Sequence, residues 1–197
     1  MSQEQAVREA LSLFSQKVTE NKDYLSELDT PIGDGDHGGN MKRGVDALQE
    51  KLDDQAEDAS VVDLLKAAAM AMMSKVGGAS GPLYGTAFLE MAKALQGQAG
   101  DWGAAIQAAA DGIAKRGHAQ AGDKTMLDVW LPAAEAAQEG KLTADQIDSW
   151  VQATEDMQAR KGRASYVGER SVGHIDPGAM STAYWLKALV EAGVLND

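Results

Sequence analysis

The chain has 197 residues, of which 44% are hydrophobic and 24% charged, and it contains no cysteine. This is the length of one domain that is large enough to fold without disulfide bonds or a structural metal. The lack of cysteine excludes a disulfide scaffold, a thiolate zinc site and a thiol nucleophile. A formal charge of −12 opposes nonspecific binding to nucleic acid or anionic membranes. With no bilayer-spanning apolar run and no signal-peptide pattern, we expect a cytoplasmic protein forming a single domain over residues 1–197.

Helices dominate the expected structure, because alanine is the commonest residue and β-branched runs are almost absent. Val7, Leu11, Phe14 and Val18 recur at helical spacing. The predicted helices cover, in chain order, about residues 7–18, 24–28, 40–52, 61–76, 86–95, 102–116, 126–138, 144–157 and 179–193, with Asn40, Ser60 and Thr143 as N-caps. Pro132 predicts either a kink or a helix that starts near it. The expected fold class is one all-α domain of about eight helices.

Glycines gather in four stretches between the predicted helices: 33–39, 77–85, 117–122 and 162–178. A connection between helices ordinarily needs only a glycine or two as a C-cap. Glycine-rich loops that open onto helix N-termini let backbone N–H groups approach a ligand closely. Any single stretch could be a flexible connection, but four together favour a ligand held at one end of a helix bundle.

Three carboxylates stand within eight residues, at Asp29, Asp34 and Asp36. Two unit charges about 4 Å apart repel by about 4 kcal/mol at an effective dielectric of 20. A hard divalent cation removes this conflict, and Mg²⁺ prefers carboxylate oxygens, with phosphate and water completing its octahedron. Asp34 and Asp36 can share one ion or bridge two. The alternative is an acidic helix-capping turn that uses one aspartate and leaves the others in solvent.

Two familiar motifs do not account for this stretch. Gly33, Gly35 and Gly38 satisfy G-x-G-x-x-G, but no strand precedes them and aspartates stand where a pyrophosphate must enter. A calcium-binding EF-hand loop starting at Asp34 needs an acidic residue or amide at position 38 and glutamate at 45, where the chain has Gly38 and Val45.

Two further segments suit an anion. Ser80 and the backbone of 76–85 offer hydrogen-bond donors, although a wide C-cap remains an alternative there. In 160–170 there are four cations: Arg160, Lys161, Arg163 and Arg170. Helix C-terminal charge explains the first two, whereas Arg163 lies beyond Gly162 and can clamp a phosphate. His37, between Asp36 and Gly38, favours a role beside the ligand rather than in the core.

Four motifs together resemble one family. They are Leu-Asp-Thr-Pro-Ile-Gly-Asp-Gly-Asp-His-Gly-Gly-Asn-Met from residue 28, Val-Gly-Gly-Ala-Ser-Gly-Pro-Leu-Tyr-Gly from residue 76, Gly-Asp-Lys-Thr-Met-Leu-Asp-Val-Trp from residue 122, and the run from Gln158 to Ala179. In this order they resemble the ADP-binding L subunit of dihydroxyacetone kinase. The resemblance extends from about Leu28 to the last helix.

The resemblance implies a closed bundle of eight antiparallel helices with a nucleotide, ADP or ATP, at one end. It implies that Asp29, Asp34 and Asp36 hold two Mg²⁺ ions and, with Arg163, form the catalytic group. It places the following residues at the nucleotide: His37, Gly38, Gly39, Asn40, Ala79, Ser80, Gly117, Met126, Arg163, Asp176, Pro177 and Gly178.

The resemblance also implies a reaction and two protein partners. The γ-phosphoryl group would pass to dihydroxyacetone on a separate K subunit, and a phosphohistidine protein, M, would recharge ADP in place. Association of two copies of this chain stays open. The alternatives are an L subunit of an ATP-exchanging kinase for a related acceptor and a nucleotide-bound regulatory adaptor. A metal-dependent phosphohydrolase is a weaker third.

Overall fold

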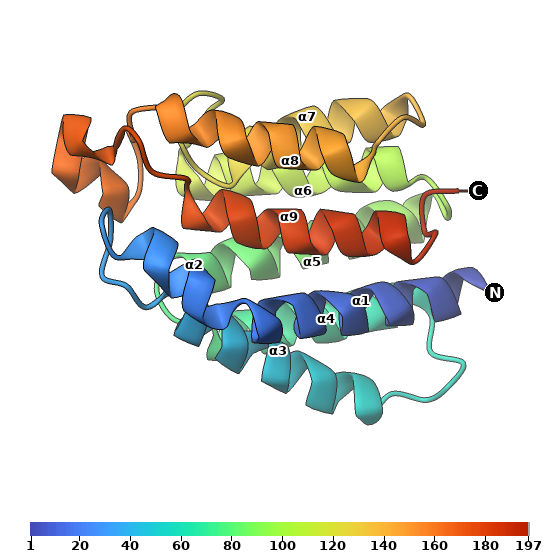
Figure 1. The fold of residues 1–197 in the computed structure, drawn as a ribbon. Coiled ribbons are helices and arrows are strands. Elements are labelled where there is room, and N and C mark those ends of the chain that lie inside the picture. The colour runs from blue at the N-terminus through green and yellow to red at the C-terminus, as the bar shows by residue number, and fades with distance from the viewer. Residues whose placement is uncertain (197) are drawn as a thin grey trace.

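A computed structural model describes residues 1–196. In that range the chain is entirely helical, with nine α-helices, two 3-10 segments and no strand (Figure 1). The elements are α1 (Gln3–Glu20), α2 (Lys22–Asp29), α3 (His37–Asp53), α4 (Val61–Lys75), α5 (Ser80–Gly97), α6 (Trp102–Gly117), α7 (Leu127–Gln138), α8 (Ala144–Ala153), η1 (Thr154–Asp156), η2 (Arg163–Ser171) and α9 (Pro177–Glu191).

Eight of the α-helices form a closed ring. Contacts run from α1 to α3, then through α4, α5, α6, α7, α8 and α9, and α9 packs back on α1. The short α2 extends α1 and packs on α3 and α9. Neighbours in the ring run antiparallel, so α3, α5, α7 and α9 all begin at the end remote from the two termini (Figure 1). The expected all-α closed bundle of about eight antiparallel helices is confirmed.

Aromatic side chains cross the interior of the ring. Phe14 of α1 lies 5.8 Å from Trp185 of α9, and Trp185 lies 5.0 Å from Phe88 of α5, as ring-centroid distances in edge-on geometry. The predicted apolar face of α1 is buried in this core. Edge-on aromatic pairs add to the stabilisation that burial supplies, so the core ties three helices of the ring together.

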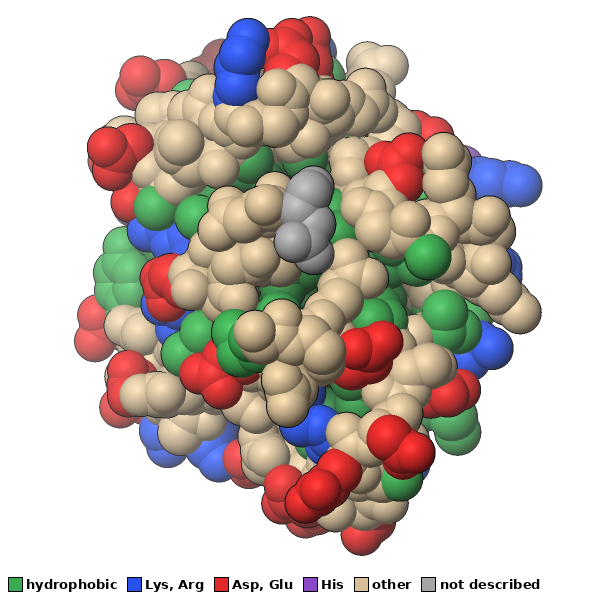
Figure 2. Space-filling model, turned by 90° about the vertical axis from the view of Figure 1, so that its right-hand side faces the viewer, with side chains coloured by type: hydrophobic (Ala, Val, Ile, Leu, Met, Phe, Trp, Pro, Cys, Tyr) green, Lys and Arg blue, Asp and Glu red, His purple; other side chains and the backbone are tan. Residues whose placement is uncertain are grey.

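The end that carries the chain termini is shown in Figure 2. Acidic and basic side chains are interspersed around this face, with apolar side chains visible between them. None of the described helices is long and apolar enough to cross a membrane.

Several helix boundaries confirm the sequence analysis, and others correct it. Ser60 and Thr143 cap α4 and α8 through their side chains. However, α3 begins at His37 rather than Asn40, and α5 begins at Ser80 rather than Thr86. Glycines taken as loop residues therefore lie inside helices. A Cβ on Gly81 would lie 2.4 Å from the Val76 carbonyl oxygen, so glycine there permits close packing rather than a flexible connection.

Pro132 lies inside a helix. α7 begins at Leu127, before the proline, so the expectation of a helix that starts near Pro132 is wrong. Proline has no N–H to donate to the Asp128 carbonyl. The apolar residues Leu127, Val129, Trp130 and Ala133 are all fully buried, so burial of this face favours the helix despite the lost hydrogen bond.

Candidate functional site

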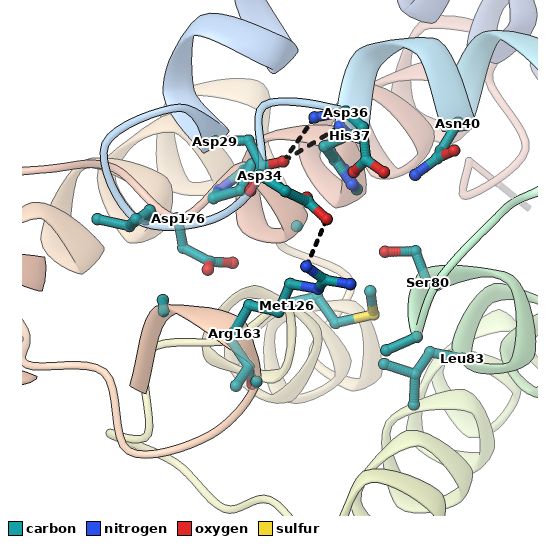
Figure 3. Close-up of a pocket in the computed structure, with 18 of the residues that line it drawn as sticks. Asp29, Asp34, Asp36, His37, Asn40, Ser80, Leu83, Met126, Arg163 and Asp176 are labelled. Carbon is teal, nitrogen blue, oxygen red and sulfur yellow. Dashed lines mark hydrogen bonds and ion pairs between the residues drawn. The ribbon is translucent and has the colours of Figure 1, made fainter. Parts of the chain in front are cut away.

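A cleft of about 280 Å³ opens at the end of the ring where α3, α5, α7 and α9 begin (Figure 3). All four glycine-rich regions of the sequence reach this end, because each precedes or opens one of those helices. Residues of the cleft that the sequence analysis named are Asp29, Asp34, Asp36, His37, Asn40, Ala79, Ser80, Met126, Arg163, Asp176, Pro177 and Gly178. Segments distant in the sequence therefore meet at one site.

Asp29, Asp34 and Asp36 lie together on one wall of the cleft. Each offers an oxygen such that all three atoms are within 4.8 Å of one another. Asp29 is buried, whereas Asp34 and Asp36 are exposed. An all-oxygen set with this spacing fits a divalent cation of the Mg²⁺ type, which takes one or two carboxylates and completes its shell with water and phosphate.

The loop between α2 and α3 gives the aspartates this arrangement. Asp29 Oδ2 accepts hydrogen bonds from the backbone N–H groups of Asp36 at 3.0 Å and of His37 at 3.2 Å. A Cβ on Gly33 would lie 2.1 Å from Asp29 Oδ1, and Gly35 adopts a φ of +74° beside Thr30. Both positions need glycine, one for space and one for its backbone conformation. The alternation of glycine and aspartate is thus required by the turn.

Burial works against the charge of Asp29. It raises the pKa of that carboxyl, the two backbone hydrogen bonds oppose the rise, and the nearby charges of Asp34 and Asp36 add to it. A bound cation removes both the repulsion and part of the desolvation cost. The N-termini of four helices also face the cleft, and the positive ends of their dipoles favour an anion there. The site can therefore hold a cation and a polyanion side by side.

Arg163 approaches the aspartates from the opposite side of the cleft (Figure 3). Its Nη1 lies 2.5 Å from Asp34 Oδ2, while two thirds of the side chain stays exposed. It comes from the start of η2, directly after Gly162. Lys161 of the same segment also lines the cleft, whereas Arg160 and Arg170 do not. Of the four clustered cations, two are therefore placed to meet a bound anion.

His37 occupies a different position from the one its sequence context suggests. The imidazole of His37 is buried, and its Nε2 lies 2.9 Å from Ser181 Oγ. Tyr84 OH lies 2.6 Å from the same oxygen. Burial lowers the pKa of His37 to about 4, so the imidazole is neutral at pH 7. One side of His37 joins a buried hydroxyl network, and only a small part of the residue reaches the cleft.

Asp176 is the N-cap of α9 and lies deep in the cleft. Its Oδ2 accepts a hydrogen bond from the Ala179 N–H at 2.8 Å. Burial raises the pKa of this carboxyl to about 7, a rise that the cap hydrogen bond and the charge of Lys124 oppose. Pro177 follows as the first residue of the helix, a position where its missing N–H costs nothing.

Three residues that the resemblance places at the nucleotide do not line the cleft: Gly38, Gly39 and Gly117. A Cβ on Gly38 would lie 1.7 Å from the Lys22 carbonyl oxygen, so this glycine allows α3 to approach α2. Gly117 is the last residue of α6, and a Cβ there would lie 3.6 Å from Leu83, which itself lines the cleft. Whether these glycines contact a ligand through their backbones stays a prediction.

Several lining residues were missed from the sequence. They are Ile32, Lys124, Thr125 and Ala164. Five more lie in stretches that the sequence analysis described without placing these residues at the ligand: Gly77, Gly78, Leu83, Lys161 and Gly162. Leu83 supplies an apolar wall opposite the aspartates (Figure 3), and its position in a glycine-rich stretch was the available signal. Lys124 is a lysine with 1% exposure, and nothing local in the sequence distinguishes it from a surface lysine.

Comparison with known proteins gives the family. Residues 31–191 match the family model described as the DAK2 domain. A Listeria innocua protein named PEP-dependent dihydroxyacetone kinase 1, ADP-binding subunit DhaL, is 50% identical over 187 residues, covering 93% of this chain and 94% of that protein. Its Escherichia coli counterpart is 43% identical, with 86% and 88% covered. Human triokinase/FMN cyclase is 33% identical, and the match covers only 32% of that longer protein.

Solved structures share the fold. The native crystal structure of the C. freundii dihydroxyacetone kinase matches 94% of this chain and 34% of its own, with a TM-score of 0.76 at 23% identity. The same kinase in complex with AMP-PNP and Mg²⁺ matches with a TM-score of 0.74 at 24% identity. The resemblance to the ADP-binding L subunits of dihydroxyacetone kinase is thus confirmed, and the chain belongs to the DAK2 domain family.

Proposed function

We propose that this chain is the nucleotide-binding, phosphoryl-transferring subunit of a dihydroxyacetone kinase. It holds ADP or ATP at the cleft through two Mg²⁺ ions on Asp29, Asp34 and Asp36. The observation that carries this proposal is the set of three aspartate oxygens within 4.8 Å at an end of the ring lined by four helix N-termini. The names of the relatives as ADP-binding subunits, and the AMP-PNP and Mg²⁺ in the related kinase structure, support it.

Each part of the cleft has a distinct task in this proposal. Bound Mg²⁺ supplies charge neutralisation at the phosphate oxygens, the main requirement of phosphoryl transfer. Asp29, held by two backbone N–H groups, keeps the carboxylate wall in place. Arg163 can leave its exposed ion pair with Asp34 and bind a phosphate group instead. Its guanidinium can donate to two phosphate oxygens at once. Ser80 and the N–H groups of α5 add neutral donors.

Other residues contact the remaining parts of the nucleotide. Leu83 and Met126 form the apolar wall, which suits an adenine face. We place Gly117 at this side, behind Leu83. His37, Gly38, Gly39 and Asn40 present the first turn of α3, and Ala79 precedes α5. The Asp176-Pro177-Gly178 turn closes the site at the start of α9.

The acceptor and the phosphate donor are assigned to other proteins. We place dihydroxyacetone on a separate K subunit, and recharging of ADP in place on the phosphohistidine protein M. The relatives that this chain covers almost completely are named as subunits of a PEP-dependent kinase. The naming of these relatives as subunits supports a separate protein for the acceptor.

Native mass spectrometry and calorimetry test the proposal. Wild type is expected to bind about one ADP per chain in Mg²⁺, with loss of binding when EDTA is added. Asp34→Ala is expected to weaken ADP binding by about 100-fold or more. Loss of a residue that only orients a metal ligand already costs up to about 100-fold in metal affinity, and Asp34 is proposed to bind the metal directly. Asp46→Ala, at an exposed aspartate of α3 that pairs with Lys42, is the matched control. Unchanged binding in Asp34→Ala contradicts the proposed metal site.

Nucleotide exchange separates the coenzyme role from an ordinary ATP-exchanging kinase. Slow release of labelled ADP, together with turnover when K subunit and a phosphohistidine donor are supplied, supports recharging in place. Rapid exchange with free ATP supports the alternative. A chain that binds nucleotide but gives no turnover with any K subunit is instead a regulatory adaptor.

A further inference from the structure

We propose that Lys124 is a positioning residue that holds the Arg163 segment over the aspartates. Lys124 lies in the connection between α6 and α7, and its side chain is among the largest fully buried ones. Its Nζ donates hydrogen bonds to the carbonyl oxygen of Met157 at 3.0 Å and to that of Ser171 at 2.5 Å. These two carbonyls stand at the two ends of the segment that carries Arg163, so one ammonium joins both ends.

The backbone around Lys124 is built to direct its side chain inward. Lys124 has a φ of +61°, a left-handed conformation that is costly for a residue with a side chain. Asp128 sustains it, with Oδ1 accepting from the Gly122 N–H at 2.6 Å and Oδ2 from the Thr125 N–H at 2.9 Å. Asp123 adds a further hydrogen bond from the Gln120 N–H. Such strain persists only where the surrounding contacts over-determine it.

Apart from the exposed ion pair between Arg163 and Asp34, a few hydrogen bonds hold the segment from Met157 to Ser171. Ser171 Oγ accepts from the Ala159 N–H at 2.8 Å and donates to the Gly168 carbonyl. Asp123, the neighbour of Lys124, accepts from the Arg160 N–H at 3.0 Å through its backbone carbonyl. Arg160, Lys161, Arg163 and Tyr166 are exposed. The apolar core therefore contributes little here, and the contacts around Lys124 fix the segment.

The charge of Lys124 is held without an ion pair among the described residues. No carboxylate of residues 1–196 lies within salt-bridge distance of Nζ. Burial opposes the charged form, and Asp176, Glu155 and Asp156 favour it from further away. A buried ammonium without a carboxylate is stabilised by hydrogen bonds from its N–H groups, and here two backbone carbonyls accept from two of the three. The side chain thus acts as a clamp on the loop.

This inference rests on the proposed function for its ligand readout, but the clamp itself can be measured without ligand. In Lys124→Met, hydrogen exchange at the amides of residues 159–173 is expected to accelerate about 10-fold or more, since hydrogen bonds from a charged donor are lost. The amides of α3 and α5 are expected to stay unchanged. Lys141→Met, an exposed lysine at the other end of the ring, is the matched control. Unchanged exchange in residues 159–173 overturns the clamp even if the protein binds no nucleotide.

The second arm shows whether Lys124 acts through Arg163. Release of fluorescent ADP in Mg²⁺ is expected to be about 10-fold faster in Lys124→Met than in wild type, and Lys124→Arg, which keeps the charged donors, is expected to restore slow release. The double variant with Arg163→Ala is expected to release no faster than Arg163→Ala alone, because the two act in one path. Additive effects indicate that Lys124 contacts the nucleotide directly and overturn the positioning role. Should Lys124→Met not fold, Lys124→Gln replaces it in both arms.

Discussion

The three aspartates do different work although they have the same chemistry. Asp29 is buried and accepts two backbone hydrogen bonds, whereas Asp34 and Asp36 face solvent. The first therefore organises the turn that presents the other two. In the proposed metal site, Asp29 therefore keeps the three carboxylates in place even when no cation is bound.

Replacing two of these aspartates separates folding from binding. Asp29→Ala is expected to lower the free energy of unfolding by about 1–3 kcal/mol in EDTA, because two backbone N–H groups lose their acceptor. Asp34→Ala is expected to unfold at nearly the same urea concentration as wild type, since the substitution removes an exposed ion pair. Urea unfolding measures both. Equal effects of the two substitutions contradict the distinct role of Asp29.

His37 makes the stability depend on pH with a defined sign. Burial lowers its pKa to about 4 from an ordinary 6.5, so between these values the unfolded chain binds more protons than the folded one. Its contribution to stability is therefore present above pH 6.5 and is lost as the pH falls toward 4. In EDTA, the free energy of unfolding is expected to fall between pH 7 and pH 4.5 by about 2–3 kcal/mol less in His37→Gln than in wild type.

Wild type must be compared with His37→Gln because two carboxyl groups change the free energy of unfolding with pH in the direction opposite to His37. Burial raises the pKa values of Asp29 and Asp176, so their contributions to stability fall as the pH rises. Both carboxyls are present in both proteins and cancel in the difference. Parallel stability curves for the two proteins are inconsistent with a neutral, buried His37.

Sequence reasoning found the residues of the site whose signal is local. Asp29, Asp34 and Asp36 come together through one short turn, so their spacing was enough. Lys124 meets Met157 and Ser171 only after α7 and α8 have folded back. No local pattern contains that information, because the two carbonyls belong to the backbone of a distant segment. His37 lines the cleft, but its imidazole is buried, and its hydrogen bond to Ser181 depends on α9.

At the scale of the helix, glycine was the residue most easily misinterpreted. Low helix propensity predicted that 77–85 is a loop, yet α5 begins at Ser80. Gly85 packs against α4, where a Cβ would lie 2.1 Å from Met73 Cγ. Propensity is a weak preference that tertiary packing overrides, and the close contact between α4 and α5 exists only because these positions have no side chain.

Two adjacent glycines at the start of α3 test this explanation. In Gly38→Ala the new Cβ meets the Lys22 carbonyl oxygen, whereas in Gly39→Ala it meets only the tip of Arg43, at 4.0 Å. Gly38→Ala is therefore expected to destabilise the protein by about 1–3 kcal/mol through displaced packing. Gly39→Ala is expected to be neutral or to stabilise by up to about 1 kcal/mol, since alanine favours a helix.

Thermal unfolding in the absence of nucleotide measures both variants, so any role of these glycines in binding does not enter. The pair shares helix, turn and substitution, and differs only in what the added methyl group meets. Equal stability of Gly38→Ala and Gly39→Ala shows that α3 does not need to approach α2 this closely.

At the scale of the molecule, the antiparallel ring itself creates the site. Every second helix begins at the same end, which brings four N-termini and the connections before them together around one cleft (Figures 1 and 3). The same alternation sends the two termini to the opposite end. Closure of α9 on α1 is required for this, because Asp176 and Arg163 come from the last third of the chain and Asp29 from the first.

The aromatic core should make the ring unfold as one unit. Phe88 of α5 contacts Trp185 of α9 and Phe14 of α1 across the interior. Phe88→Ala is expected to lower the free energy of unfolding by about 3–5 kcal/mol through the cavity that it leaves. Tyr166→Ala, at a side chain that is 86% exposed, is expected to stay within about 0.5 kcal/mol of wild type.

Urea unfolding followed by far-UV circular dichroism and by tryptophan fluorescence distinguishes a cooperative ring from helices that detach separately. Each helix of the ring is held by two neighbours, so both signals are expected to change in one coincident transition in wild type and in Phe88→Ala. Non-coincident transitions in wild type show that part of the ring opens first. The cleft, which needs both ends of the chain in place, is then lost before the core unfolds.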